Sequence, residues 1–236
     1  MTRIGMLTPS SNTAGAGNLP AARRLPRGER AFRPLPGHRD RTVGGRARPV
    51  RGGADPGRRR ASVARQVDVI AWNGTSASWL GFGRDEALAR AITGRTGIPA
   101  TTAILALNTL LRRMGARRLG LVTPYTADVQ AKIAANYAAA GISCAAERHA
   151  GLSDNFSFAQ MPAQAIEAMM MEVAAAKPDA IAVICTNMDA SRLAPQIEAR
   201  TGIPVLDSIA VTLWGALDTL QIAKTPLQQA GTMFRY

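Results

Sequence analysis

Cys185 is the residue of this chain whose type and setting best suit chemistry. It follows the apolar run 179–184 and precedes Thr186 and Asn187. A thiol at the end of a buried strand, beside hydroxyl and amide groups, can deliver a proton to a carbon atom or remove one. The alternative is a small buried hydrophobic side chain, as most free cysteines are. The other cysteine, Cys144, lies inside a predicted strand, and we interpret it as structural.

The sequence repeats itself, with one difference at this cysteine. Three segments of the first half return in the second: 4–9 as 119–124, 68–75 as 179–186, and 96–99 as 201–204. The second pairing sets Gly74 opposite Cys185. Two halves of like fold would therefore face each other with a thiol on one side only.

The elements expected around these residues alternate between strands and helices. In the second half the predicted strands are 118–123, 142–148, 180–184 and 204–206, and the helices are 127–140, 158–176 and 193–201. The first half offers strands 3–7, 67–72 and 100–102, with helices 84–96 and 104–114, and helix 209–220 ends the repeat. Alternation of this kind predicts right-handed crossovers and parallel sheets. The expected fold is α/β, with two pseudo-symmetric doubly wound lobes: residues 1–105 with 208–236, and residues 106–207.

Polar loops follow four of the predicted strands, at 8–12, 73–76, 123–125 and 185–187. In doubly wound sheets, ligands bind outside the carboxyl ends of the strands. We therefore predict that these loops line one active-site cleft between the lobes. For two of the candidates other roles remain open: Thr75 and Ser76 could cap the next helix, and Tyr125 could be only a turn aromatic.

Composition limits the function classes. A chain of 236 residues with 47% hydrophobic content can bury one or two ordinary cores, and it contains no apolar stretch of membrane-spanning length. We expect a soluble cytoplasmic protein with reduced thiols and no membrane partner. The two cysteines lack metal-ligand spacing, so no metal site is expected.

The net charge of +13 belongs almost entirely to one segment. Residues 14–65 hold 14 arginines and three acidic residues, whereas the rest of the chain carries only +2. Residues 14–63 are rich in Arg, Gly, Pro and Ala without apolar periodicity, so we predict that they are irregular or disordered. A basic nucleic-acid arm and an inserted linker are two interpretations of this segment.

A third interpretation, which we favour, is a coding stretch read out of frame between two compensating shifts. The spacing from Ile4 to Asp68 is 64 positions, and that from Leu119 to Asp179 is 60. The segment therefore replaces the length that ordered structure would need. We expect no specific nucleic-acid partner.

Several motifs resemble the aspartate/glutamate racemase superfamily, in its branch with maleate cis-trans isomerase and arylmalonate decarboxylase. Residues 9–13, Pro-Ser-Ser-Asn-Thr, resemble the isomerase opening, and 74–76, Gly-Thr-Ser, with Trp79 look like the decarboxylase loop. Residues 96–102 and 123–125 are also similar to this branch. The resemblance covers 1–13 and about 66–225.

The resemblance implies an enzyme without metal or organic cofactor, acting on a small carboxylate or dicarboxylate through thiol acid/base chemistry. With glycine at position 74, it favours decarboxylase-like chemistry in which Cys185 protonates an enediolate. An activity like that of maleate isomerase or of an Asp/Glu racemase is the alternative, and an inactive or poorly folded product is the alternative of another class. A homo-oligomer stays open.

The resemblance also suggests that Asn12 and Asn155 bind a carboxylate, although Asn155 could instead form a turn. The full set of predicted substrate-binding residues is Asn12, Gly74, Thr75, Ser76, Tyr125, Asn155, Thr186 and Asn187.

Overall fold

The chain forms two parallel sheets with the same strand order. The computed structural model describes residues 2–9, 12, 32–35 and 67–236. The first sheet runs β2 (Phe32–Leu35), β1 (Ile4–Leu7), β3 (Val69–Trp72) and β4 (Ala100–Thr102); the second runs β6 (Ser143–His149), β5 (Arg118–Thr123), β7 (Ala180–Val183) and β8 (Val205–Asp207). Every strand pair is parallel, so the α/β class with two like lobes is confirmed.

The strand register shows that the repeat is structural. Ile4 pairs with Val69 in the first sheet, and Leu119 pairs with Ala180 in the second. These are matching positions of the repeated segments. Residues that follow β3 and β7 therefore occupy matching places in the two lobes.

The helices of the second lobe are α5 (Ala127–Ala139), α6 (Asn155–Ala159), α7 (Ala163–Ala174) and α8 (Ala194–Thr201). Strands β6 and β7 flank β5, so right-handed crossovers put α5 and α7 on opposite faces of the sheet. The prediction of one long helix over 158–176 is wrong. Pro162 has no N–H to donate the hydrogen bond that a continuing helix needs, and it disfavours helical backbone at Met161. Helix α6 therefore ends before Pro162, and α7 begins directly after it.

In the first lobe, α2 (Ala77–Leu80) and α3 (Gly83–Thr96) follow β3. The repeated Thr-Gly-Ile-Pro motif ends α3 and α8 in the same way. Gly97 and Gly202 both adopt a left-handed backbone with φ of 71°, which glycine tolerates without steric cost. The motif thus terminates each helix directly before the last strand of its sheet.

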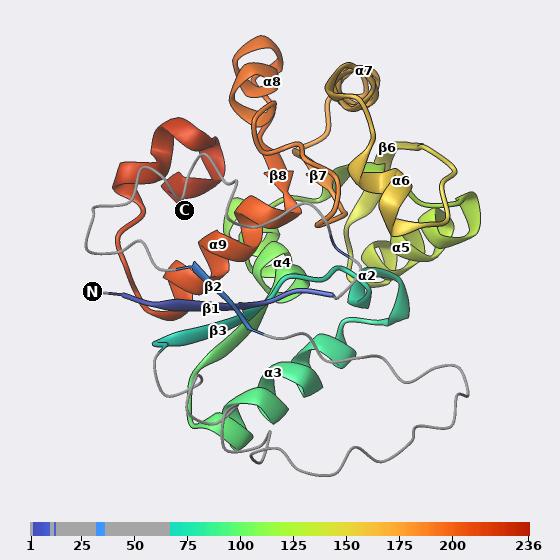
Figure 1. Ribbon diagram of the computed structural model, residues 1–236. Helices are drawn as coiled ribbons and strands as arrows, with labels where there is room; N and C mark the ends of the chain where they lie inside the picture. The colour runs from blue at the N-terminus through green and yellow to red at the C-terminus, as the bar shows by residue number, and fades with distance from the viewer. Residues whose placement is uncertain (1, 10–11, 13–31, 36–66) are drawn as a thin grey trace, which may run out of the picture.

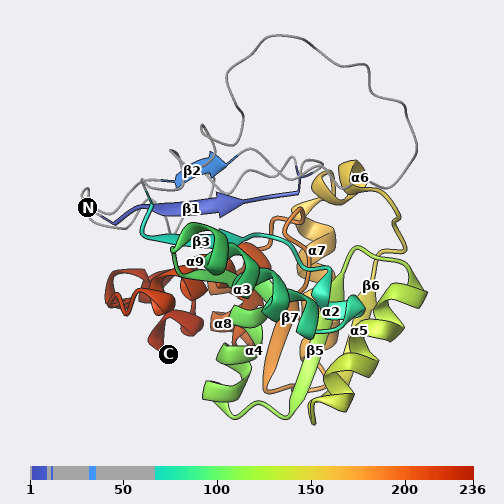
Figure 2. The ribbon, with the colours of Figure 1, turned by 90° about the horizontal axis from the view of Figure 1, so that it is seen from below.

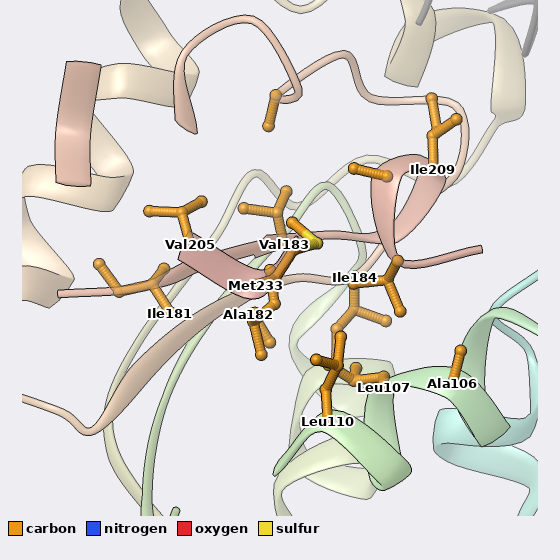
Figure 3. Close-up of a cluster of buried hydrophobic side chains, with 14 of the residues drawn as sticks. Ala106, Leu107, Leu110, Ile181, Ala182, Val183, Ile184, Val205, Ile209 and Met233 are labelled. Atoms are coloured by element: carbon orange, nitrogen blue, oxygen red, sulfur yellow. The ribbon is translucent and has the colours of Figure 1, made fainter. Parts of the chain in front are cut away.

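Two helices form the centre of the molecule, α4 (Ala103–Met114) and α9 (Ser208–Thr219), and they pack side by side (Figure 1). Helix α9 contacts β3 and β4 of one sheet and β8 of the other. Figure 3 shows side chains of α4 beside β7, β8 and the start of α9 in one hydrophobic cluster. The core is therefore continuous through the two lobes, and their boundaries at 105/106 and 207/208 stay a prediction.

The arginine-rich segment contains one element that was not expected. Phe32–Leu35 form strand β2 parallel to β1, at the sheet edge where β6 lies in the other lobe (Figure 2). The prediction of irregular structure is thus wrong for these four residues. These residues pair through main-chain hydrogen bonds with a strand distant in the sequence, and such bonds require no apolar periodicity in the local sequence. Pro34 is compatible with this strand, because an edge strand tolerates a residue without an N–H donor. The rest of 14–63 lies outside the described residues.

The chain ends in two 3-10 helices, η4 (Thr225–Ala230) and η5 (Thr232–Arg235). Across the described part of the chain, no helix has the length and apolar character needed to cross a bilayer.

Candidate active site at the junction of the lobes

Loops after β1, β3, β5 and β7 meet where the two sheets adjoin, as the strand-end argument predicts. Two hydrogen bonds between side chains join the lobes there. Thr75 Oγ1 lies 2.9 Å from Tyr125 OH, and Asn12 Nδ2 donates to Thr186 Oγ1 over 2.9 Å. The site is therefore built from both halves of the repeat.

Cys185 is buried at this junction, with only 3% of its surface exposed. The main-chain N–H of Asn187 donates to its Sγ over 3.3 Å. Burial raises the pKa of the thiol to about 11, although the N–H of Asn187 and the hydroxyl of Tyr125 favour the thiolate. At neutral pH, Cys185 is consequently a protonated thiol.

Tyr125 lies between the two lobes with its ring packed by two aromatic side chains. The ring centroids of Trp79 and Phe158 are 5.0 and 5.4 Å away, both in edge-on geometry. Burial, followed by the charge of a Cys185 thiolate, raises the pKa of the Tyr125 hydroxyl. Tyr125 therefore presents a buried, neutral hydroxyl next to the thiol.

Thr186 links three segments. Its hydroxyl donates to the main-chain oxygen of Asn73 over 3.1 Å while it accepts the bond from Asn12. Asn73 Oδ1 in turn accepts from Thr212 Oγ1 of α9 over 3.0 Å. These bonds fix the Gly74 loop and the Cys185 loop relative to each other and to the central helix.

The space next to Gly74, which has no side chain, is occupied by the indole ring of Trp72. A Cβ atom on Gly74 would lie 2.6 Å from Trp72 Nε1 and 2.7 Å from Cε2, closer than real contacts allow. The indole therefore occupies the volume that a side chain at position 74 would need. The first lobe carries an aromatic ring at the place where the second lobe carries the thiol.

Ser76, Asn155 and Asn187 lie around this centre. Ser76 starts α2 but makes no capping bond, and the Thr75 hydroxyl bonds Tyr125 instead, so the capping alternative is wrong. Asn187 Nδ2 donates to the main-chain oxygen of Asn155. The cap of α6 is Asp154, which accepts from Ser157 N over 2.9 Å, and both roles of Asn155 stay predictions.

Three residues near the site were not predicted: Trp72, Asp207 and Thr212. Asn73 was predicted only as part of the loop 73–76. Asp207 had a visible signal, because it is a polar residue directly after an apolar strand segment. Thr212 lies within an apolar helix, and nothing in the sequence distinguishes it. Within the described residues, no three His, Cys, Asp or Glu side chains are grouped so as to hold a metal ion.

Two α/β lobes of like topology, with a thiol at their junction, define the class as the Asp/Glu racemase superfamily, in its maleate isomerase and arylmalonate decarboxylase branch. The sequence pattern of arylmalonate decarboxylases matches residues 58–234, and this chain belongs to that family. The resemblance to this branch predicted from the motifs is confirmed.

Two individual relatives from this branch are similar to the chain in sequence. The chain is 29% identical to arylmalonate decarboxylase from Bordetella bronchiseptica over 152 residues, which are 63% of each protein. It is 27% identical to maleate isomerase from Nocardia farcinica over 113 residues, 48% of this chain and 45% of the relative. These alignments span less than two thirds of either relative.

Solved structures show the same fold over nearly the whole chain. Unliganded arylmalonate decarboxylase superimposes with a TM-score of 0.68 at 26% identity, covering 93% of this chain and 92% of that one. Nocardia farcinica maleate cis-trans isomerase bound to TRIS superimposes with a TM-score of 0.79 at 24% identity, covering 100% and 98%. The two-lobed architecture is therefore that of these enzymes.

Proposed function

We propose that this chain is a cofactor-independent acid/base enzyme that decarboxylates a small malonate-type acid, with Cys185 as the proton donor. The observation that carries the proposal is the asymmetry of the junction. One lobe supplies a buried, protonated thiol, and the other supplies Gly74 beneath the Trp72 indole. A reaction that needs a proton on one face of a carbon fits this arrangement.

The chemistry follows from the groups around the thiol. When the C–C bond to the leaving CO2 breaks, its electron pair stays on the remaining fragment as an enediolate. Donors already in place would stabilise its oxygens: the hydroxyls of Thr75, Ser76 and Tyr125, with the amide of Asn187. The S–H bond of Cys185 then breaks as the new C–H bond forms, and the thiolate regains a proton from solvent.

A substrate carboxylate would sit between the two asparagines that flank the junction. The side-chain amide of Asn12 donates to Thr186, and the main-chain oxygen of Asn155 accepts from Asn187, so both asparagines lie next to the junction. We assign both as carboxylate-binding residues, because an amide N–H can donate to a carboxylate oxygen without adding charge.

An isomerase or racemase activity is the second candidate, and the similarity to maleate isomerase supports it. Racemisation by two bases needs a proton donor on each face. Position 74 carries no side chain, so another residue would have to act from the first lobe. The arrangement at Gly74 favours decarboxylation over this alternative.

The test supplies two probes, phenylmalonate and maleate, to the purified protein in D2O. Decarboxylation predicts CO2 release from phenylmalonate with one deuterium in the product, and no fumarate from maleate. Cys185→Ala should abolish turnover, while Cys144→Ala should leave it unchanged. Fumarate formation, or turnover that survives in Cys185→Ala, would overturn the proposal.

The alternative of an inactive or poorly folded product depends on residues 14–63. The family match begins only at residue 58. Thermal unfolding followed by circular dichroism tests this alternative, because a cooperative transition is expected only of a folded chain. The nucleotide sequence of codons 13 to 66 tests the frameshift interpretation directly.

We also propose a cytoplasmic location, which would keep the two free thiols reduced.

A further inference from the structure

The two lobes differ at a second position besides Gly74 and Cys185. Thr102 and Asp207 both stand six residues after the start of the Thr-Gly-Ile-Pro motif, at the end of the last strand of each sheet. Both cap the helix that follows. The lobe with the thiol uses an aspartate for this task, and the lobe without it uses a threonine.

A helix cap requires one acceptor oxygen, and Thr102 supplies it with a hydroxyl that accepts from Leu105 N over 3.0 Å. Asp207 does the same with Oδ1 alone, which accepts from the N–H groups of Ile209 and Ala210 over 3.0 and 2.9 Å. Its second oxygen, Oδ2, is buried and makes no hydrogen bond among the described residues.

The second oxygen therefore adds nothing to the cap and carries a burial cost. Burial raises the pKa of Asp207 to about 7. Because Asn, Ser or Thr would cap α9 without this cost, helix capping does not explain an aspartate here.

The place of Asp207 in the sheet gives the explanation. It pairs with Val183, two residues before Cys185 on the neighbouring strand. Ser208 Oγ donates to the Val183 oxygen over 2.7 Å and fastens the start of α9 to that strand. The N–H of Ala190, whose hydrogen bond goes to the Met188 oxygen over 3.1 Å, adds an electrostatic contribution that favours the ionised carboxylate of Asp207, and that carboxylate opposes ionisation of Cys185. Asp207 therefore faces the loop 185–190 that carries the thiol.

The other charged or titratable groups around this cluster have partners of their own. Asp189 raises the pKa of Asp207 but is exposed, with Arg192 Nε 3.7 Å away. Glu198 of α8 accepts from Val205 N at the opposite end of β8. Tyr125 approaches Cys185 as a neutral donor. Among these groups, Asp207 is the buried acid beside the thiol.

We propose that Asp207 is a positioning residue that adds to the effect of burial on Cys185, so that the thiolate left after proton transfer recovers a proton more readily. The proposal rests on the role of Cys185 as proton donor described above. A negative charge on Asp207 disfavours a second negative charge on the nearby sulfur. The thiolate therefore takes up a proton from solvent and becomes a thiol again.

The test is the rate at which neutral iodoacetamide alkylates Cys185 between pH 6.5 and 9, measured by peptide mass spectrometry. A Cys144→Ser background leaves one thiol to follow. Asp207→Asn retains a capping oxygen and removes the charge, so its melting temperature should match the parent at pH 5, where the Asp207 carboxyl is protonated in the folded protein. Its alkylation rate at pH 8 should rise about tenfold, equivalent to a fall of about one unit in the thiol pKa. Asp189→Asn is the matched control and should change the rate less than about twofold, because an exposed charge is screened.

An alkylation profile that is the same in Asp207→Asn and the parent, with equal melting temperatures at pH 5, would show that Asp207 is only a cap. If Asp207→Asn fails to fold, Asp207→Thr repeats the test with the residue found at position 102. Failure of both neutral variants to fold would also overturn the proposal, since the charge would then serve the fold. Alkylation reports on the thiol whether or not phenylmalonate is turned over. The outcome is therefore separable from that of the proposed function.

Discussion

Thr75 Oγ1 and Tyr125 OH, 2.9 Å apart, form one of two matching bonds that hold the lobes together. The other joins Thr186 Oγ1 to Asn12 Nδ2. Thr75 and Thr186 are equivalent positions of the repeat, directly after Gly74 and Cys185. Each lobe therefore reaches across with the same threonine, and the residues just before these two threonines make the lobes chemically different.

Tyr125→Phe should lower phenylmalonate turnover about 100-fold, because it removes a donor aimed at developing negative charge. It should lower the free energy of unfolding by only about 1 kcal/mol, since the Thr75 hydroxyl loses its partner. Tyr137→Phe is the matched control, because the buried Tyr137 hydroxyl has no hydrogen-bond partner among the described residues. Equal turnover in the two variants would contradict a role for Tyr125 in the reaction.

Thr186→Val should lower the free energy of unfolding by about 1–3 kcal/mol. The change keeps the shape of the side chain but leaves the Asn73 oxygen and the Asn12 amide without this partner. Urea unfolding measures the loss. Thr219→Val, whose hydroxyl donates to the Gly215 oxygen of the same helix over 2.8 Å, should cost less. A Thr186→Val variant as stable as Thr219→Val would argue against a bond between the lobes.

Gly74→Ala should destabilise the protein by about 1–3 kcal/mol and reduce turnover, because the new Cβ would overlap the Trp72 indole. Trp72→Ala removes that overlap, so the double variant should be more stable than the sum of the single changes predicts, by about 1 kcal/mol or more. A double-mutant cycle from thermal or urea unfolding measures this coupling. Additive effects would place the indole away from Gly74.

Gly215→Ala should destabilise the protein by about 1–3 kcal/mol through the contact of α9 with α4. Its Cβ would lie 2.5 Å from the Ala106 Cβ, and neither atom can rotate away. Gly94→Ala in α3 is the control, since no atom of the described part of the chain lies within 4 Å of a Cβ there. That change should stabilise the protein by about 0.5–1 kcal/mol, because alanine favours helix. Urea denaturation compares the two.

The raised pKa of Asp207 predicts a dependence of stability on pH. Its carboxyl titrates near 7 in the folded protein, against an ordinary value of 3.8. Between about pH 4 and 7 the folded state retains a proton that the unfolded chain has lost, so this residue's contribution is full below pH 4 and disappears as pH rises through 7. Thermal unfolding at pH 5 and pH 8 should therefore show a smaller loss of stability in Asp207→Asn than in the parent protein. An equal loss in both proteins would mean that Asp207 titrates normally.

The amino-acid sequence by itself determined the repeat, the parallel α/β class, the polar loops at the strand ends and the single thiol opposite a glycine. These features are local or periodic: apolar strands, Thr-Gly-Ile-Pro helix ends and strand-terminal polar residues need no knowledge of distant partners. Tertiary structure decided what lies across the junction. The bond from Thr75 to Tyr125 depends on one lobe folding against the other, and the place of Asp207 near Cys185 depends on pairing of separate strands of one sheet. The indole of Trp72 fills the place of a side chain at Gly74 through the rotamer it adopts in the folded loop. No local sequence pattern records these three contacts, because strand pairing, lobe packing and side-chain conformation are fixed only in the folded chain.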